Sequence, residues 1–173
     1  MRLAPGEFRE LVEAHQSRVF SIAYRILGDS GAAEEVAQDV FLNLHRNLDR
    51  LESAEHVLAW LRRVTVHRAT DAIRRHATRP EFEEFRDEGN WLAAVNGKSA
   101  SPLGARVEQL VATLPPVQRS VILLRYQEDL PPDEIAATLS MPVATVKSHL
   151  QRALQLLRAK AKSTLKEYTR GRF

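Results

Sequence analysis

The sequence contains no cysteine in its 173 residues, and only 6% of the residues are aromatic. The absence of cysteine excludes a disulfide scaffold, a thiolate zinc site and a cysteine nucleophile. No apolar run approaches the ~20 residues that a helix needs to span a bilayer, and residues 1–6 lack the apolar core of a signal peptide. We therefore expect a cytoplasmic protein with no membrane insertion, no cofactor, no metal site and no stable homo-oligomer.

The net charge of +3 conceals an alternation along the chain. Residues 1–61 carry six basic and ten acidic side chains, residues 62–79 six and one, residues 80–142 five and ten, and residues 143–173 eight and one. The four blocks therefore carry −4, +5, −5 and +7. Two basic segments on acidic bodies indicate two anion-binding surfaces, for which nucleic acid is a candidate ligand. Two solvated helix faces are the plainer alternative.

Apolar residues recur at three- and four-residue spacing, without the alternation that is typical of strands. The first half predicts helices at residues 8–27, 30–48 and 54–75, with Gly28 ending the first and Asp29 or Ser30 capping the second. The second half predicts three shorter helices at residues 103–114, 116–127 and 132–139, and a fourth helix at residues 142–162. The fold class expected is all-α: two small helical domains joined by a flexible linker, the second containing a helix-turn-helix.

The segment between the two helical halves has linker composition, with acidic residues, Gly, Asn and Ser. We place the first domain at residues 1–76, the linker at residues 77–101, and the second domain, with a basic C-terminal tail, at residues 102–173. The linker also contains Phe82, Phe85, Trp91 and Leu92. It is therefore either a plain tether or a segment whose aromatic residues dock on a partner or on one of the domains.

The helix predicted at residues 54–75 has one apolar and one basic face. At ~100° per residue, the inward face holds Val57, Leu61, Val64, Thr65, Ala69 and Ala72. The opposite face holds a row that suits an anionic surface: Arg63, His67, Thr70 and Arg74. Arg68 falls near the apolar face, and we expect it to pair with an acid such as Asp71 rather than to contact DNA. His67 and His76 lie on opposite sides and cannot share a metal ion, and His15 is predicted to be a core histidine.

Residues 132–139, a short turn at Ser140-Met141 and the helix from Pro142 have the spacing of a helix-turn-helix. Apolar residues from Val146 to Leu157 form the inner face of the second helix. The outer face holds Thr145, Ser148, Gln151, Arg152 and Gln155, with Lys147 and Arg158 at its edges. Hydroxyl and amide groups suit base edges, and long basic side chains suit phosphates. An ordinary amphipathic hairpin is the alternative.

Several of these segments resemble a known family. RILGD at residues 25–29, AEEVAQDVFL at 33–42, WLRRV at 60–64 and DAIRR at 71–75 resemble region 2 of the extracytoplasmic-function (ECF) sigma factors. LPPVQR at 114–119, VILLRY at 121–126, EIA at 134–136 and TVKSHLQRA at 145–153 resemble region 4 of the same family. The resemblance covers about residues 7–160 in the family's order. The helix-turn-helix alone is less specific, because many response regulators carry a similar one.

The resemblance implies a dissociable subunit that binds core RNA polymerase and directs it to promoters. Helix 30–48 would bind the β′ clamp helices through Glu35, Gln38, Asp39 and Leu42, unless this face is merely a solvated acidic surface; the β flap is the second expected polymerase contact. The −10 element would be recognised and opened by Arg62, Arg63, His67, Thr70, Arg74 and Arg75, with the loop around residues 51–57. The −35 element would be recognised by Thr145, Lys147, Ser148, His149, Gln151, Arg152 and Arg119, with Arg125 as a further possible backbone contact.

The sequence departs from the family pattern at three places. His67 replaces a common Asn, Val143-Ala144 replace a polar–Gly pair, and His149 replaces a common Arg. These differences bear on which promoter sequence is preferred. The family is usually restrained by an anti-sigma factor, which we expect as a partner.

The alternative function is a sigma-like mimic that sequesters a regulatory protein without binding DNA. Such a mimic needs neither the Arg63/Arg74 row nor the Lys147/Arg152 pair. A plain repressor that uses only the C-terminal helices leaves the first domain unexplained. An enzyme is not expected, because no glycine-rich phosphate loop, nucleophile motif or carboxylate pair stands out.

Overall fold

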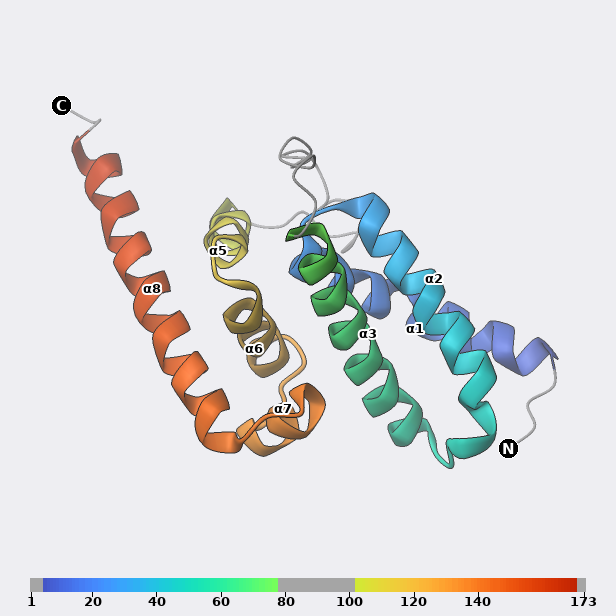
Figure 1. The fold of residues 1–173 in the computed structure, drawn as a ribbon. Coiled ribbons are helices and arrows are strands. Elements are labelled where there is room, and N and C mark those ends of the chain that lie inside the picture. The colour runs from blue at the N-terminus through green and yellow to red at the C-terminus, as the bar shows by residue number, and fades with distance from the viewer. Residues whose placement is uncertain (1–4, 78–101, 171–173) are drawn as a thin grey trace. The chain divides into compact units, whose positions relative to one another are not determined.

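The computed structural model describes residues 5–77 and 102–170, and the regular structure of these residues is helical throughout (Figure 1). This confirms the all-α prediction. Contacts divide the chain into two compact units, Met1–Gly97 and Lys98–Phe173. Of the predicted linker, only Ala77 belongs to the described residues. The docking proposed for its aromatic residues therefore lies outside them.

Unit 1 contains α1 (Pro5–Leu27), α2 (Ser30–Asn47), a single 3₁₀ turn (Leu48–Arg50) and α3 (Ala54–Ala77). Gly28 ends α1 with φ +74°, a left-handed conformation that glycine adopts without strain. Asp29 caps α2, because its Oδ1 accepts a hydrogen bond of 2.6 Å from the backbone N–H of Ala32. Ser53 does the same for α3, accepting 3.1 Å from the N–H of His56. The boundary predicted from Gly28 and Asp29 is confirmed, and the cap at Ser53 is an addition from the structure.

The core of unit 1 lies among α1, α2 and α3. Val19, Ala23, Val36, Val40 and Leu44 are buried there together with residues of α3. The predicted inward face of α3 is confirmed, with five of its six residues buried and Val64 half-buried. Val66, which that face leaves out, is also fully buried, because α3 packs against both α1 and α2. The hydroxyl of buried Thr65 donates to the Leu61 carbonyl at 2.6 Å, so burial leaves this group hydrogen-bonded.

Two side-chain predictions for unit 1 are wrong. Asp71 pairs with Arg74, at 3.6 Å between Oδ1 and Nη1, rather than with Arg68. Side chains on a helix lean toward its N-terminus, so Arg74 leans back over Asp71 and Arg68 leans away from it. His15 is half-buried and does not belong to the core. Burial, with a smaller contribution from nearby Arg18, lowers the pKa of His15.

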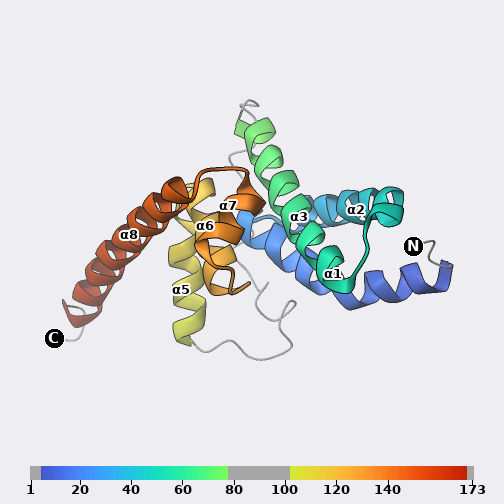
Figure 2. The ribbon, with the colours of Figure 1, turned by 90° about the horizontal axis from the view of Figure 1, so that it is seen from below.

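Unit 2 contains α5 (Pro102–Ala112), α6 (Pro116–Tyr126), α7 (Pro132–Leu139) and α8 (Val143–Arg170). Each of the first three begins with proline, whose missing N–H is not needed in a first turn. Helix α6 packs against α5, α7 and α8 (Figures 1 and 2). Since it has three neighbours, four consecutive residues of α6, Val121 to Leu124, are all buried. Helix α8 is continuous (Figure 2) and is longer than the predicted 142–162.

Candidate functional site

The first candidate surface is the outer face of α8. Val146 and Ala153 are fully buried, and Leu150, Leu154 and Leu157 pack against the cluster that contains Ala153. This fixes which side of α8 faces outward. The predicted −35 residues divide by exposure: Lys147, Ser148, Gln151 and Arg152 are exposed, and Thr145 and His149 are half-buried. One helix face thus presents two cations, one hydroxyl and one amide to solvent.

The turn before α8 is held by backbone hydrogen bonds. Ser140 ends α7 in the left-handed region, at φ 53° and ψ 47°. Its N–H donates to the Ala136 carbonyl, and the N–H of Met141 donates to the same carbonyl at 3.0 Å. The N–H groups of Thr145 and Val146 then donate to the Pro142 carbonyl, at 3.0 and 3.1 Å. A tight turn with defined caps therefore separates α7 from α8, as a helix-turn-helix requires.

Arg119 does not belong to α8 but lies in the first turn of α6. Its Nη2 donates to the carbonyls of Ala112 and Leu114, at 2.6 and 3.0 Å. Arg125 is half-buried, with its guanidinium carbon 5.8 Å from the ring centroid of Tyr126. The predicted phosphate contacts of both arginines remain predictions, and the structure shows that Arg119 already makes two hydrogen bonds within the protein.

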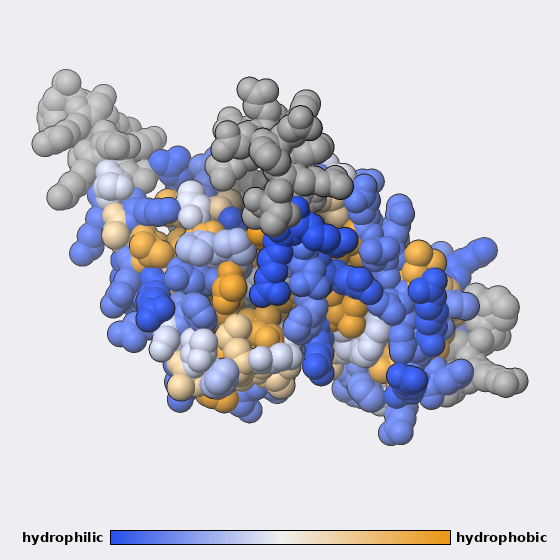
Figure 3. Space-filling model, in the orientation of Figure 1, coloured by the Kyte–Doolittle hydropathy of each residue, from blue (hydrophilic) through white to orange (hydrophobic). Residues whose placement is uncertain are grey.

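The second candidate surface lies along α3, where Figure 3 shows hydrophilic side chains gathered. Of the predicted −10 residues, Arg63, Arg74 and Arg75 are exposed, and Arg62, His67 and Thr70 are half-buried. The Thr70 hydroxyl donates to the Val66 carbonyl at 2.8 Å. The pair between Arg74 and Asp71 is largely solvated, with 74% and 57% of the two side chains exposed, so its attraction is weak and it can open for a phosphate.

The loop before α3 consists of Leu51, Glu52 and Ser53. Leu51 is buried in the core, as is Val57 in the first turns of α3. Glu52 and Ser53 are exposed between these two anchors. The segment predicted to act with α3 on the −10 element is therefore short and fixed at both ends.

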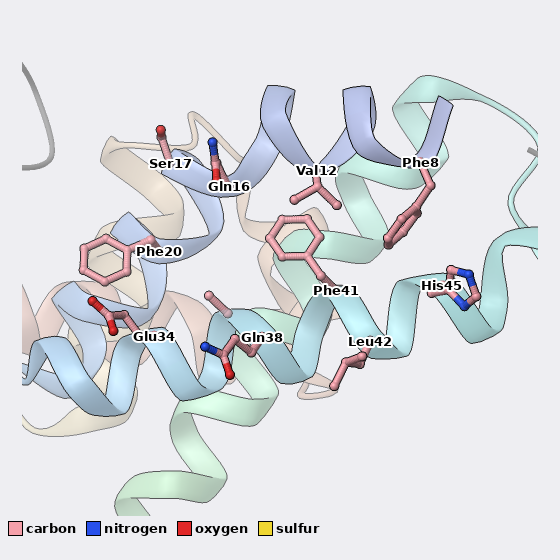
Figure 4. Close-up of a pocket in the computed structure, with 11 residues that line it drawn as sticks. Phe8, Val12, Gln16, Ser17, Phe20, Glu34, Gln38, Phe41, Leu42 and His45 are labelled. Atoms are coloured by element: carbon pink, nitrogen blue, oxygen red, sulfur yellow. The ribbon is translucent and has the colours of Figure 1, made fainter. Parts of the chain in front are cut away.

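The third candidate surface is a groove between α1 and α2 with a volume of about 890 Å³. Phe8, Val12 and Phe20 line it from α1, and Gln38, Phe41 and Leu42 are among its residues from α2. In Figure 4, Phe41 points toward Val12, and Leu42 lies at the edge of the groove. Leu42 is 59% exposed, and it adjoins the apolar lining of the groove rather than standing alone on the surface.

All four residues of the predicted polymerase-binding face, Glu35, Gln38, Asp39 and Leu42, are exposed on α2. The groove adds the α1 side, which the sequence did not reveal. Phe8 and Val12 follow the apolar period of α1, so the pattern assigns them to the core, yet both are only half-buried. The Phe8 ring packs at the edge of the core and also meets His45 of α2 edge-on, with 5.0 Å between ring centroids.

Within residues 5–77 and 102–170, no three His, Asp or Glu side chains converge as metal ligands. In the same part of the chain, no helix combines the length and the apolar character that crossing a membrane requires.

Comparison with known proteins assigns each unit. Residues 11–79 match the family model of Sigma-70 region 2, and residues 104–157 match that of Sigma-70, region 4. SigK of Mycobacterium tuberculosis H37Rv, an ECF RNA polymerase sigma factor, is 31% identical over 162 residues, which cover 87% of this chain and 83% of SigK. The probable RNA polymerase sigma factor RfaY of Xanthomonas campestris is 30% identical over 170 residues, 95% of this chain. The chain spans only 42% of the length of RfaY.

The fold is also found in a solved structure. The sigma factor RpoE of Bartonella quintana, crystallised in complex with the anti-sigma factor NepR, superposes with a TM-score of 0.66 at 19% identity. The match covers 90% of this chain and 97% of RpoE. Two helical units that match regions 2 and 4 in this order define a sigma factor, a class of transcription initiation proteins that are not enzymes. Within that class, the chain belongs to the ECF sigma factors.

Proposed function

We propose that this chain binds core RNA polymerase in the cytoplasm and directs it to promoters, with α8 recognising the −35 element as duplex DNA. The observation that carries this proposal is the orientation of α8. Burial of Val146 and Ala153 turns Ser148, Gln151 and Arg152 outward together. A helix presenting hydroxyl, amide and guanidinium groups near its N-terminal half fits the major groove, where such groups bond base edges. Lys147, at the edge, suits a phosphate.

In this proposal, α3 recognises and opens the −10 element. The exposed Arg63 and Arg74 lie three turns apart on one face of the helix, and Arg75 flanks them. Such a row of cations can bind successive phosphates along a DNA strand. Strand opening also requires cations that bind the backbone of the separated strand. The short anchored loop at Glu52 and Ser53 adjoins the N-terminus of α3, where an unstacked base could be held.

The groove between α1 and α2 is the proposed docking site for the β′ clamp helices of the polymerase. Its apolar floor can bury side chains of an incoming helix, and the exposed Leu42 can be buried in return. Glu34, which lines the groove, and Glu35 and Asp39 beside it favour a partner helix with basic residues. Unit 2 is the proposed contact for the β flap.

An anti-sigma factor is the proposed regulator. Support comes from the fold shared with the Bartonella RpoE that was crystallised with NepR. The alternative, a mimic that sequesters a regulatory protein without touching DNA, would use the groove but not the basic faces of α3 and α8. Those faces favour the sigma factor.

Transcription with purified components tests the proposal. Core polymerase plus the full chain should initiate at one class of promoters from a genomic fragment library. Substitution of Lys147 and Arg152 together by alanine should abolish this initiation while leaving binding to core polymerase unchanged. Initiation that does not depend on the chain, or full initiation by the double variant, would contradict the proposal; polymerase binding without initiation at any promoter would favour the mimic.

A further inference from the structure

The C-terminal end of α5 lacks the glycine cap that ends α1. Instead the helix ends with hydrogen bonds to the third preceding residue, as in a 3₁₀ turn. The N–H of Thr113 donates to the Leu110 carbonyl at 3.1 Å, and the N–H of Leu114 donates to the Val111 carbonyl at 3.0 Å. The last carbonyls of a helix have no partner within the helix and carry the negative end of its dipole. The carbonyls of Ala112, Thr113 and Leu114 are therefore acceptors that need donors from elsewhere.

Two cations from different helices supply these donors. Arg119 of α6 donates through Nη2 to the carbonyls of Ala112 and Leu114, at 2.6 and 3.0 Å. Lys160 of α8 donates through Nζ to the Thr113 hydroxyl at 2.6 Å, with the Thr113 carbonyl at 3.4 Å. Hydrogen bonds from charged donors are stronger than those between neutral groups. These hydrogen bonds connect the C-terminal end of α5 to both α6 and α8.

The position of Lys160 on α8 matters because α8 is also the candidate recognition helix. Lys160 lies eight residues beyond Arg152, which is about 12 Å along a helix. Between them, Leu154 and Leu157 pack against the cluster formed by Leu114, Ile122 and Ala153. A polar tie at one end of this apolar contact restricts the rotation and tilt of α8, and with them the direction in which its exposed residues point.

Arg119 is half-buried, and three of the five N–H groups of its guanidinium face the protein. Each N–H of its Nη2 has a carbonyl acceptor, and its Nε is inaccessible to solvent. We propose that Arg119 and Lys160 form a clamp on the end of α5 that holds α8 in its recognition position. Arg119 is then a positioning residue and makes no phosphate contact. This inference rests on the proposed binding of the −35 element by α8.

The test measures the binding of promoter DNA by polymerase holoenzyme carrying the full chain, over a series of salt concentrations. Arg119→Ala is compared with Lys147→Ala, the variant of a proposed phosphate contact, at a temperature well below the unfolding midpoint of each. We expect Arg119→Ala to weaken binding about tenfold while the slope of log K against log salt stays that of the wild type. Lys147→Ala should reduce that slope by about 0.9.

Two further variants separate positioning from stability alone. Lys160→Met keeps the aliphatic stem and removes the donors, so it should weaken binding as Arg119→Ala does. Lys160→Arg, which keeps charged donors at this position, should bind promoter DNA as tightly as the wild type does. A reduced slope for Arg119→Ala, or unchanged affinity of the folded variant, would overturn the proposal.

The clamp can also be judged without DNA. Amide hydrogen exchange at Thr113 and Leu114 should be faster in Arg119→Ala than in the wild type, and unchanged exchange would refute the clamp. If wild-type holoenzyme showed no dependence on the −35 sequence while exchange at these amides rose in the variant, the function proposed for α8 would fail and the clamp would stand.

Discussion

Replacing Ser140 by glycine should stabilise unit 2, because Ser140 holds the turn of the helix-turn-helix in a left-handed conformation. Its φ of 53° and ψ of 47° lie where a Cβ is unfavourable. The side chain is exposed, so its removal leaves no cavity. The two backbone hydrogen bonds to the Ala136 carbonyl do not depend on the side chain.

The size of the effect follows from two opposing terms. Relief of the left-handed conformation is worth about 1–2 kcal/mol. Glycine makes the unfolded chain more flexible, which costs about 0.4–1 kcal/mol. The middle of the two ranges gives a net gain of about 0.8 kcal/mol, or roughly 3–6 °C in the unfolding midpoint of a unit of this size.

Thermal unfolding followed by circular dichroism measures this shift, and Ser148→Gly provides a matched control. Ser148 is exposed within α8, where glycine lowers stability by about 0.5 kcal/mol relative to serine. The same chemical change should therefore have opposite signs at the two positions. A loss of stability in both variants would refute the account of the turn.

Three more predictions concern the candidate surfaces and pH. Arg152→Ala should weaken promoter binding by about 1–3 kcal/mol in a filter-binding assay if Arg152 contacts a base. Lys162→Ala, which removes an exposed charge from the same helix, should weaken promoter binding less. Equal losses in the two variants would mean that Arg152 contributes only its positive charge. Leu42→Ala should weaken binding to core polymerase by about 1–2 kcal/mol, measured by fluorescence anisotropy, whereas Glu13→Ala, at an exposed position of α1 that does not line the groove, should not. Because the folded pKa of His15 lies below its ordinary 6.5, the unfolded chain binds more protons just below pH 6.5, and stability should fall as the pH decreases through this range. Urea titrations at several pH values should show a smaller decline for His15→Gln, and an identical decline would exclude His15 as a cause.

Much of the fold could be predicted from the sequence because its signals are local. Gly28 and Asp29 mark a helix boundary through their own backbone and side-chain preferences, and the prolines at the starts of α6 and α7 do the same. The burial of Val66 could not be predicted in this way, because it depends on α3 packing against two other helices. The spacing of apolar residues in one helix does not indicate how many helices pack against it.

The candidate site divides in the same way. The outward face of α8 could be predicted, because it is the complement of an apolar stripe. The groove could not, since Phe8 and Val12 obey the same period as core residues and only the packing of α1 on α2 leaves them half-buried. Arg119 shows the limit of charge as a signal. A basic residue near a recognition helix suggests a DNA contact. In the structure Arg119 instead donates to carbonyls at the end of α5, and these partners cannot be identified without the three-dimensional packing.

The most direct test of the central claim, that α8 lies on the −35 element and α3 on the −10 element, uses the absence of cysteine. Single cysteines introduced as Ser148→Cys on α8 and Ala59→Cys on α3, both at exposed positions, can each carry an iron chelate that cleaves nearby DNA. In initiating holoenzyme complexes, the account predicts cleavage around −35 from residue 148 and around −10 from residue 59. Cleavage at the same place from both positions, or at neither element, would contradict it.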